Sequence, residues 1–233
     1  MKIAVISDIH GNIEAFESIL SLIAQRDVEA VYCLGDVVGY GGSPNECVEL
    51  IRRMHIRTVA GNHDKAVTGE LSIDDFSAAA KDAVLWTRSV MKQENISFLS
   101  RLPMSFIEHG AQFVHSSPDE PGDFRYLLSL GHALESFSAM TEQLCFIGHT
   151  HRPAIYCEDG TTGSVSPSVR TIVNVGSIGQ PRDGDPRSCC VLFDTVSRDV
   201  EYLRADYDIA AAQAKILQAG LPSKLAMRLE SGI

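Results

Sequence analysis

The 233-residue sequence has no long hydrophobic run and no recognisable secretion signal. None of its apolar stretches approaches the eighteen or so residues that a membrane-spanning helix requires. The N-terminal segment MKIAVISDIHG reaches the polar residues Asp8 and His10 too early for a signal peptide. These absences argue against a membrane protein, and we expect a cytoplasmic one.

Basic residues are scarce. The chain has 20 Lys and Arg residues against 30 Asp and Glu residues, which gives a net charge of -10. An extended nucleic-acid surface needs clustered Lys and Arg to neutralise phosphates, so this charge argues against one. A small phosphate substrate is not excluded, because bound divalent cations reverse the sign of the local field.

The sequence also lacks a CxxC spacing and any linker rich in Pro or Gly. Its six cysteines are scattered, which argues against a zinc or disulfide framework, and we expect reduced thiols buried as small apolar side chains. A composition of 45% hydrophobic and 21% charged residues is ordinary for a folded protein. We therefore expect a single domain over residues 1–233.

The hydrophobic pattern predicts an α/β fold. Short apolar runs alternate with helix-period segments in the first half, which is typical of a mainly parallel sheet. The strands expected there cover 3–7, 30–34 and 57–60, and the helices cover 13–25, with Asn12 as N-cap, and 45–54. Later strands are expected within 105–115, 144–149, 154–160, 170–176 and 189–205. Further helices are expected at 75–91 and 127–140, and a C-terminal helical tail over 209–233. The stretch from Thr161 to Ser168 is expected to be a hairpin tip.

Metal-capable side chains follow five of these expected strands. They are Asp8, Asp36, Asn62, His115 and His149. In α/β sheets ligands bind outside the carboxyl ends of the strands, so we expect these side chains to converge. Glycines at positions 11, 35, 39, 61 and 148 let the backbone turn tightly beside them.

Two of the clusters contain pairs spaced two residues apart, Asp8 with His10 and His149 with His151. Residues i and i+2 of an extended chain point to the same side, so each pair can address one ion or two neighbouring ions. Carboxylate, imidazole and amide ligands suit manganese, iron or zinc better than a thiolate or calcium site would. Taken singly, D-x-H also fits a surface turn or N-cap and GDVVG a turn, but their joint occurrence at strand ends favours an active site.

The motif set resembles that of the calcineurin-like metallophosphoesterase superfamily. The matching segments are Asp8-Ile9-His10, Gly35-Asp36-Val37-Val38-Gly39, Gly61-Asn62-His63-Asp64, His115 and Gly148-His149-Thr150-His151, and NVGSIGQPRDGDPR extends the similarity to about residue 187. GNHD and GDVVGYG stand where serine/threonine protein phosphatases have GNHE and GDxVDRG. The sequence is therefore most similar to the small prokaryotic phosphodiesterase and phosphatase branch.

This resemblance implies a four-layer αββα sandwich of two mixed sheets with flanking helices, and a centre of two divalent ions, of manganese, iron, zinc or nickel. Matched by position, Asp8, His10 and His151 would bind one ion, Asn62, His115 and His149 would bind the other, and Asp36 would bridge them. A hydroxide activated by the ions would attack phosphorus.

The resemblance also assigns roles within GNHD. His63 would lie over the substrate phosphate and assist the leaving group, for which the ordinary pKa of histidine is well suited. Asp64 would either fix the tautomer of the His63 imidazole or stabilise the turn. Tyr40 and Arg182, or alternatively Arg187, are further candidates for substrate contact.

The expected activity is hydrolysis of a small phosphoester or nucleotide. A dinucleoside polyphosphate hydrolase, a protein phosphatase of the same superfamily and a non-catalytic metal-binding scaffold are the alternatives. The histidine of GNHD, which a scaffold would be free to lose, favours a catalyst. The three histidines that match no motif, His55, His109 and His132, are expected to play no part in metal binding.

Overall fold

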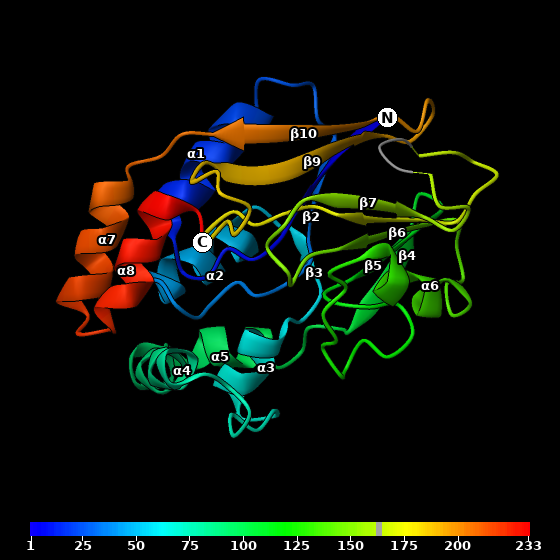
Figure 1. Ribbon diagram of the computed structural model, residues 1–233. Coiled ribbons are helices and arrows are strands. Elements are labelled where there is room, and N and C mark those ends of the chain that lie inside the picture. Colours follow the sequence, from blue (N-terminus) through cyan, green and yellow to red (C-terminus); the bar gives the residue numbers. More distant parts are fainter. Residues whose placement is uncertain (162–164) are drawn as a thin grey trace.

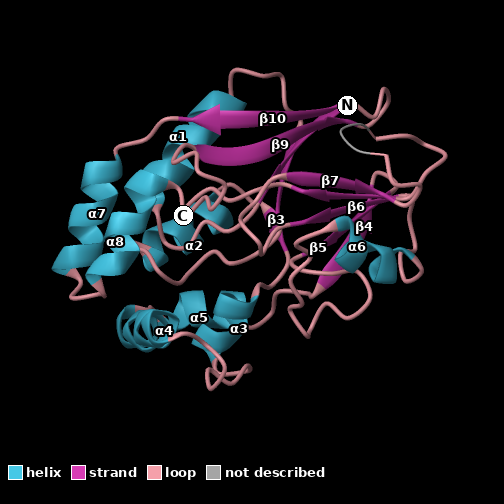
Figure 2. Ribbon diagram, in the orientation of Figure 1, coloured by secondary structure: helices cyan, strands magenta, loops and turns pink. Residues whose placement is uncertain are grey.

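The computed structural model describes residues 1–161 and 165–233, which form two sheets that face each other and helices that lie outside them (Figures 1 and 2). The first sheet has the strand order β10-β9-β1-β2-β3 and the second the order β4-β5-β6-β8-β7. The strands of the first are β1 (Lys2–Ile6), β2 (Ala30–Cys33), β3 (Arg57–Thr58), β9 (Ser188–Asp194) and β10 (Val200–Ala205). Those of the second are β4 (Ser105–Glu108), β5 (Ala111–Val114), β6 (Leu144–Ile147), β7 (Ala154–Cys157) and β8 (Thr171–Asn174).

Both sheets are mixed, with parallel strands at the centre. Strands β1, β2 and β3 are parallel neighbours, as are β5, β6 and β8. Antiparallel strands complete each sheet, including the predicted hairpin of β9 and β10. The parallel strands bring several carboxyl ends to one edge of the molecule, where loops can converge on a site.

Aromatic side chains fill the space between the two sheets. The ring of Phe146 on β6 lies 5.3 Å from that of Phe193 on β9 of the other sheet, and 5.3 Å from that of Phe113 on β5. All three rings are fully buried. Burial of such large apolar surfaces is the main force that holds the sheets together.

Helices cover the outer faces of both sheets. On the first sheet lie α1 (Ile13–Ile23) and α2 (Pro44–Arg53), and α1 buries Phe16 and Ile19 in that layer. Asn12 caps α1 as predicted, because its side chain accepts a hydrogen bond from the N–H of Ala15 at 3.1 Å. On the second sheet lies α6 (Leu130–Phe137), which buries Phe137. The predicted α/β class with two mixed sheets and flanking helices is confirmed.

The C-terminal tail consists of two helices that pack on their own chain. They are α7 (Ile209–Gln218) and α8 (Ser223–Ser231), and they form an apolar cluster with α4 (Ala78–Val90) through Ile216, Leu225 and Ala83. An ion pair of 2.6 Å joins Lys215 on α7 to Glu14 on α1. In Figure 1 the two helices lie beside α1 and above α4, next to the loops that leave the first sheet.

Several elements differ from those expected. Two short helices, α3 (Asn62–Thr68) and α5 (Gln93–Leu99), were not predicted, and the predicted helix over 127–140 is shortened to α6. Of the expected hairpin tip from Thr161 to Ser168, residues 162–164 lie outside the described residues. All six cysteines are buried, as expected. None of the described helices has both the length and the apolar character that crossing a membrane would need.

Candidate metal centre

The metal-capable Asp and His residues lie in tight loops just beyond the carboxyl ends of β1, β2, β5 and β6, and Asn62 is the first residue of α3, which follows β3. The backbone is left-handed at five of them, which are Asp8 (φ 55), His10 (φ 50), Asp36 (φ 51), His149 (φ 66) and His151 (φ 60). The expectation that the backbone is extended at Asp8 and His10, and at His149 and His151, is therefore wrong. Side-chain-bearing residues adopt this conformation at a cost of about 1–3 kcal/mol each, and such residues cluster at functional sites.

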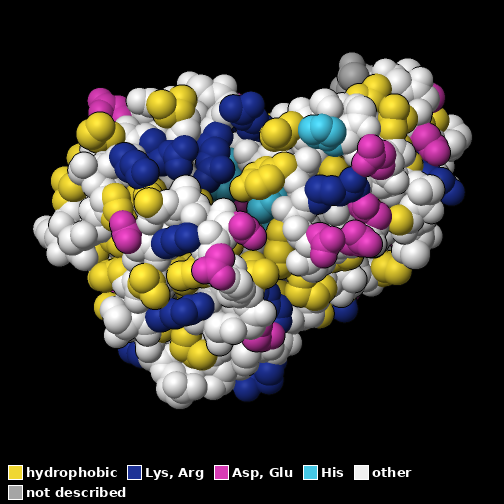
Figure 3. All heavy atoms as spheres, turned by 60° about the horizontal axis from the view of Figure 1, so that its bottom comes forward, with side chains coloured by type: hydrophobic (Ala, Val, Ile, Leu, Met, Phe, Trp, Pro, Cys, Tyr) yellow, Lys and Arg dark blue, Asp and Glu magenta, His cyan; other side chains and the backbone are white. Residues whose placement is uncertain are grey.

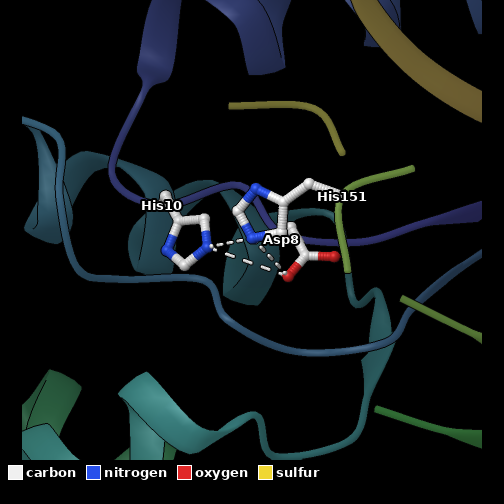
Figure 4. Close-up of side chains that lie close together, drawn as sticks. All are labelled: Asp8, His10 and His151. Carbon is white, nitrogen blue, oxygen red and sulfur yellow. Dashed lines mark hydrogen bonds and ion pairs between the residues drawn. The ribbon is translucent and has the colours of Figure 1, made fainter. Parts of the chain in front are cut away.

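Asp8, His10 and His151 form the first of three overlapping groups of His and Asp side chains in the described part of the chain (Figure 4). The Nε2 atom of His151 lies 3.3 Å from Oδ1 of Asp8, and that of His10 lies 3.7 Å from the same oxygen. The two Nε2 atoms are 3.1 Å apart. One carboxylate oxygen and two imidazole nitrogens thus face a single point, as the ligands of one divalent ion would.

Asp36, His115 and His149 form the second group. Oδ2 of Asp36 lies 3.4 Å from Nε2 of His115 and 3.6 Å from Nε2 of His10, which belongs to the first group. The same carboxylate oxygen therefore faces both groups. Such a central carboxylate is suited to bridging two ions.

The other oxygen of each carboxylate is held by a backbone amide. Oδ2 of Asp8 accepts a hydrogen bond of 2.9 Å from the N–H of His149, and Oδ1 of Asp36 accepts one of 2.8 Å from the N–H of His63. Asp8 follows a strand of the first sheet and His149 one of the second, so this bond joins the two sheets at the site. One oxygen on each carboxylate is thereby fixed and the other is left for an ion.

Backbone carbonyls orient three of the imidazoles. The Nδ1 atom of His10 lies 3.1 Å from the carbonyl oxygen of Val38, and that of His115 lies 2.7 Å from the carbonyl oxygen of Leu34. His151 makes the same kind of contact, at 2.5 Å, with Gln180. A proton on each Nδ1 leaves Nε2 as the free ligand atom, which is how metal-binding histidines are usually held.

Several buried polar atoms at the site have no hydrogen-bond partner. Among the described residues they include Oδ1 of Asp8, Oδ1 of Asn62, Nε2 of His115 and Nε2 of His149. Buried polar atoms are rarely left unpaired, because desolvation without a partner costs free energy. These four atoms all belong to residues matched to metal ligands, so the residues present fit a pair of divalent cations.

The electrostatics of the site favour the protonation states that metal ligands need at Asp36 and His149, but not at His115. Burial opposes the charge of Asp36, but His115 and its other histidine neighbours hold the pKa of its carboxyl well below the usual range. Burial lowers the pKa of His149 to about 3, which keeps its imidazole neutral at physiological pH. His115 is the exception, because the Asp36 carboxylate outweighs burial and raises the pKa of its imidazole to about 9, so a metal ion would have to displace a proton there. Ionised carboxylates and neutral imidazoles are the forms that bind metal ions.

His63, on the first turn of α3, forms the third group with His10 and Asp36. Its ring centroid is 4.9 Å from that of His10 and 4.4 Å from that of Tyr40, and the ring of Phe76 packs on it at 5.2 Å. Burial lowers the pKa of His63 to about 4. The side chain of His63 lines a cleft of about 710 Å³ that also contains Asn62 and His149.

The carboxylate of Asp64 accepts hydrogen bonds from four backbone N–H groups. Its Oδ2 accepts hydrogen bonds from the N–H groups of Asp36 at 2.8 Å and Gly61 at 3.0 Å. Its Oδ1 accepts from those of Val37 at 3.0 Å and Val38 at 3.3 Å. These bonds favour the turn-stabilising role over the one in which Asp64 orients the imidazole of His63. Gly61 is needed for close approach, because a Cβ atom there would lie 2.1 Å from Oδ1 of Asp36, while its own φ of -93 is ordinary.

We predict that Asp64→Asn lowers the free energy of unfolding by about 2–4 kcal/mol, because a buried acceptor of four amide hydrogen bonds is replaced by a group that is half donor. Urea unfolding of the metal-free protein measures this loss, with the exposed Asp82→Asn on α4 as the matched control. If Asp64 served only to orient His63, stability would stay at the wild-type value and only turnover would fall.

Of the other described candidates from the sequence analysis, only Tyr40 and Arg182 line the cleft. The guanidinium carbon of Arg182 lies 5.8 Å from the centre of the Tyr40 ring. Arg187 is exposed and pairs with Asp185 at 2.7 Å. His55, His109 and His132 are absent from the His and Asp groups found among the described residues, and Nε2 of His109 instead lies 2.9 Å from the hydroxyl of Tyr32.

The cleft residues that the sequence reasoning missed include Phe76, Tyr126 and Arg228. Tyr126 stacks on the ring of His149 with centroids 4.0 Å apart. They come from the loop before α4, the segment before α6 and helix α8, none of which carries a motif. In Figure 3, His side chains are visible inside a hollow of the surface, and Lys and Arg side chains gather along its rim on the side where α7 and α8 lie.

Comparisons with known proteins agree with this geometry. Residues 1–198 match the model of the calcineurin-like phosphoesterase superfamily domain. An uncharacterized protein of Methanocaldococcus jannaschii is 40% identical over 240 residues, a match that covers 99% of this chain and 98% of that protein.

Solved structures show the same fold. The crystal structure of a metallophosphoesterase from Sphaerobacter thermophilus is 39% identical, with a TM-score of 0.89 and coverage of 100% of this chain and 99% of the other. A hypothetical protein from Pyrococcus horikoshii shares the fold at 19% identity, with a TM-score of 0.86 and coverage of 100% and 98%. The chain thus belongs to the calcineurin-like phosphoesterase superfamily and is a metal-dependent hydrolase of phosphoesters.

Proposed function

We propose that the chain hydrolyses small phosphodiesters or phosphomonoesters at a centre of two divalent cations. Asp8, His10 and His151 would hold one cation, and Asn62, His115 and His149 would hold the other. The carboxylate of Asp36 would serve both. The observation that carries this proposal is the position of Asp36 Oδ2, which faces an imidazole nitrogen of each group at 3.4 and 3.6 Å.

The cations supply Lewis acidity, which lowers the pKa of bound water and offsets the charge of the phosphate. The remaining steps fall to the protein. His63 donates a hydrogen bond to a phosphate oxygen and then a proton to the leaving alkoxide. The negative charge of a bound phosphate favours the protonated form of His63 that this transfer needs. Phe76 and Tyr40 pack on the ring of His63 and hold it in place.

Arg182 is the proposed substrate contact, and its guanidinium carbon lies 5.8 Å from the centre of the ring of Tyr40, which packs on His63. The backbone N–H of Arg182 donates to the carbonyl of His151 at 3.1 Å, which ties Arg182 to the first group of ligands. Its side chain donates from Nη2 to Oε1 of Gln180 at 2.9 Å. Its Nε is buried without a partner. An arginine held this way can bind a phosphate oxygen through the donors that remain.

The test is hydrolysis of bis(4-nitrophenyl) phosphate and 4-nitrophenyl phosphate by protein stripped with a chelator and then loaded with manganese, zinc, iron or nickel. We expect no turnover by the stripped protein, turnover with at least one cation, and two ions per chain by elemental analysis. Saturation at a single ion would overturn the dinuclear centre. Two bound ions without turnover of either ester, with any of the four metals, would overturn the proposed reaction.

A further inference from the structure

A second arginine, Arg228 of the C-terminal helix α8, reaches the same cleft as Arg182. Arg228 lines the cleft of about 710 Å³ that contains His63, and it also lines a neighbouring cavity of about 540 Å³. Tyr40 and Ser77 line both spaces as well. Arg228 therefore stands where the cleft continues from the metal centre toward α8.

The end of α8 is fastened to the loop that carries Arg182. The carbonyl oxygen of Gly232 accepts a hydrogen bond of 2.9 Å from the N–H of Gly184. Gly232 ends α8 in a left-handed conformation and packs against Asp185, where an added Cβ would come within 2.8 Å of the backbone. Nε of Arg228 donates to the main-chain oxygen of Ile233 at 2.6 Å. The two arginines thus project from segments that are held together.

Within the part of the chain that the structure describes, no Asp or Glu side chain forms an ion pair with Arg182 or Arg228. Asp75 and Asp123 also line the cleft. Both arginines line the same cleft. Burial lowers the pKa of Arg228, and the positive charge of Arg182 lowers it further. Two half-buried guanidinium groups without a carboxylate side chain as partner are stabilised by an anion that binds between them.

We propose that Arg228 and Arg182 bind a second phosphate group of the substrate, one that is not hydrolysed and that extends from the metal centre toward α8. This inference rests on the proposed function and adds to it a substrate class, phosphoesters that carry at least one further phosphate. Lys224 lines the adjoining cavity and adds a positive charge on the same side. Charge-assisted contacts with two arginines favour such a group over a neutral one.

The test compares two substrates that differ only in the second phosphate, the 4-nitrophenyl ester of thymidine 5′-phosphate and the same ester with an added 3′-phosphate. For the wild type we expect a higher kcat/KM with the second phosphate. In Arg228→Met and Arg228→Gln this preference should fall about tenfold, the value of one charge-assisted hydrogen bond, and Arg228→Lys should recover part of it. The exposed Arg101→Met, in the turn after α5, is the matched control and should keep the full preference.

A binding measurement separates this inference from the proposed reaction. Calorimetry on the metal-free protein compares thymidine 3′,5′-bisphosphate with thymidine 5′-monophosphate, and needs no turnover. We expect the wild type and Arg101→Met to prefer the bisphosphate and the Arg228 variants to lose that preference. If the folded Arg228 variants kept the wild-type preference in both measurements, the inference would be wrong while the proposed reaction stood. Absence of turnover with a preserved, Arg228-dependent preference would instead overturn the reaction alone.

Discussion

Replacing His63 by alanine should lower kcat about 10²- to 10⁴-fold on phosphodiesters with poor leaving groups, which is the usual contribution of a positioned general acid. The effect should be smaller on 4-nitrophenyl esters, because a nitrophenolate leaves without a proton. The imidazole ring of His63 packs against the rings of Tyr40, Phe76 and His10, so these neighbours hold it in a fixed position. Steady-state kinetics on a methyl and a nitrophenyl diester of the same nucleotide measure both effects.

Two controls accompany the His63 variant. Elemental analysis should find the wild-type metal content, since His63 is not a proposed ligand. His109→Ala, which removes a partly exposed histidine bonded to Tyr32 away from the cleft, should leave turnover unchanged. An equal loss on both leaving groups would assign His63 to phosphate binding only, and full activity on both would remove it from the mechanism.

Asp36→Asn should reduce the metal content from two ions per chain to one or fewer and lower kcat/KM by at least about 10³-fold. Asp36 Oδ2 is the atom that both groups of ligands share, and several kcal/mol of charge stabilisation depend on the ions it bridges. The amide of asparagine keeps the shape of the carboxylate but removes its negative charge. Elemental analysis and kinetics across a manganese titration measure the two losses.

Asp27→Asn serves as the control for this substitution. Asp27 is exposed in a turn with φ of 51, a conformation that asparagine accepts readily, so the variant should keep both ions and full turnover. Two tightly bound ions in Asp36→Asn would contradict the bridging role.

The strand ends were predictable because each combines two local signals. A short apolar run followed at once by a polar residue marks where a buried strand leaves the sheet, as with Val114 and His115. Parallel neighbours then bring those ends together without further information. The convergence of Asp8 with Asp36 required only the βαβ pattern and this rule. His149 follows a strand of the other sheet, so its approach to Asp8 depends on how the two sheets pack.

The conformation of the loops was not predictable in the same way. Asp8 and His10 were expected on an extended segment, yet both are left-handed, a state that an isolated Asp or His seldom adopts. The tertiary structure imposes it, since the N–H of His10 donates to the carbonyl of Asp36 at 2.9 Å and that of Asp8 to Gly35 at 3.0 Å. Helix α3 was missed for a similar reason, because seven residues are too few to show helical periodicity.

The cleft walls escaped prediction because they depend on packing between distant segments. Arg228 lies on a helix whose sequence shows only that one face is apolar. Its place beside Arg182 follows from the contact of Gly232 with Gly184 and from the cluster that α7 and α8 form with α4. Neither contact leaves a spacing or a motif that could be recognised in advance. The arginines that we propose for substrate selection therefore lie in segments that carry no recognisable motif.

The division of the ligands between the two sheets sets the earliest moment in synthesis at which the protein can take up its metals. Asp8, Asp36 and Asn62 follow strands of the first sheet, whereas His115, His149 and His151 follow strands of the second. Each proposed ion draws on both sheets, so a nascent chain that has emerged only as far as β5 offers neither ion a complete set. We expect the protein to bind its metal ions only after His151 has left the ribosome and β6 has paired with its neighbouring strands. Metal binding would therefore come late in the synthesis of the chain.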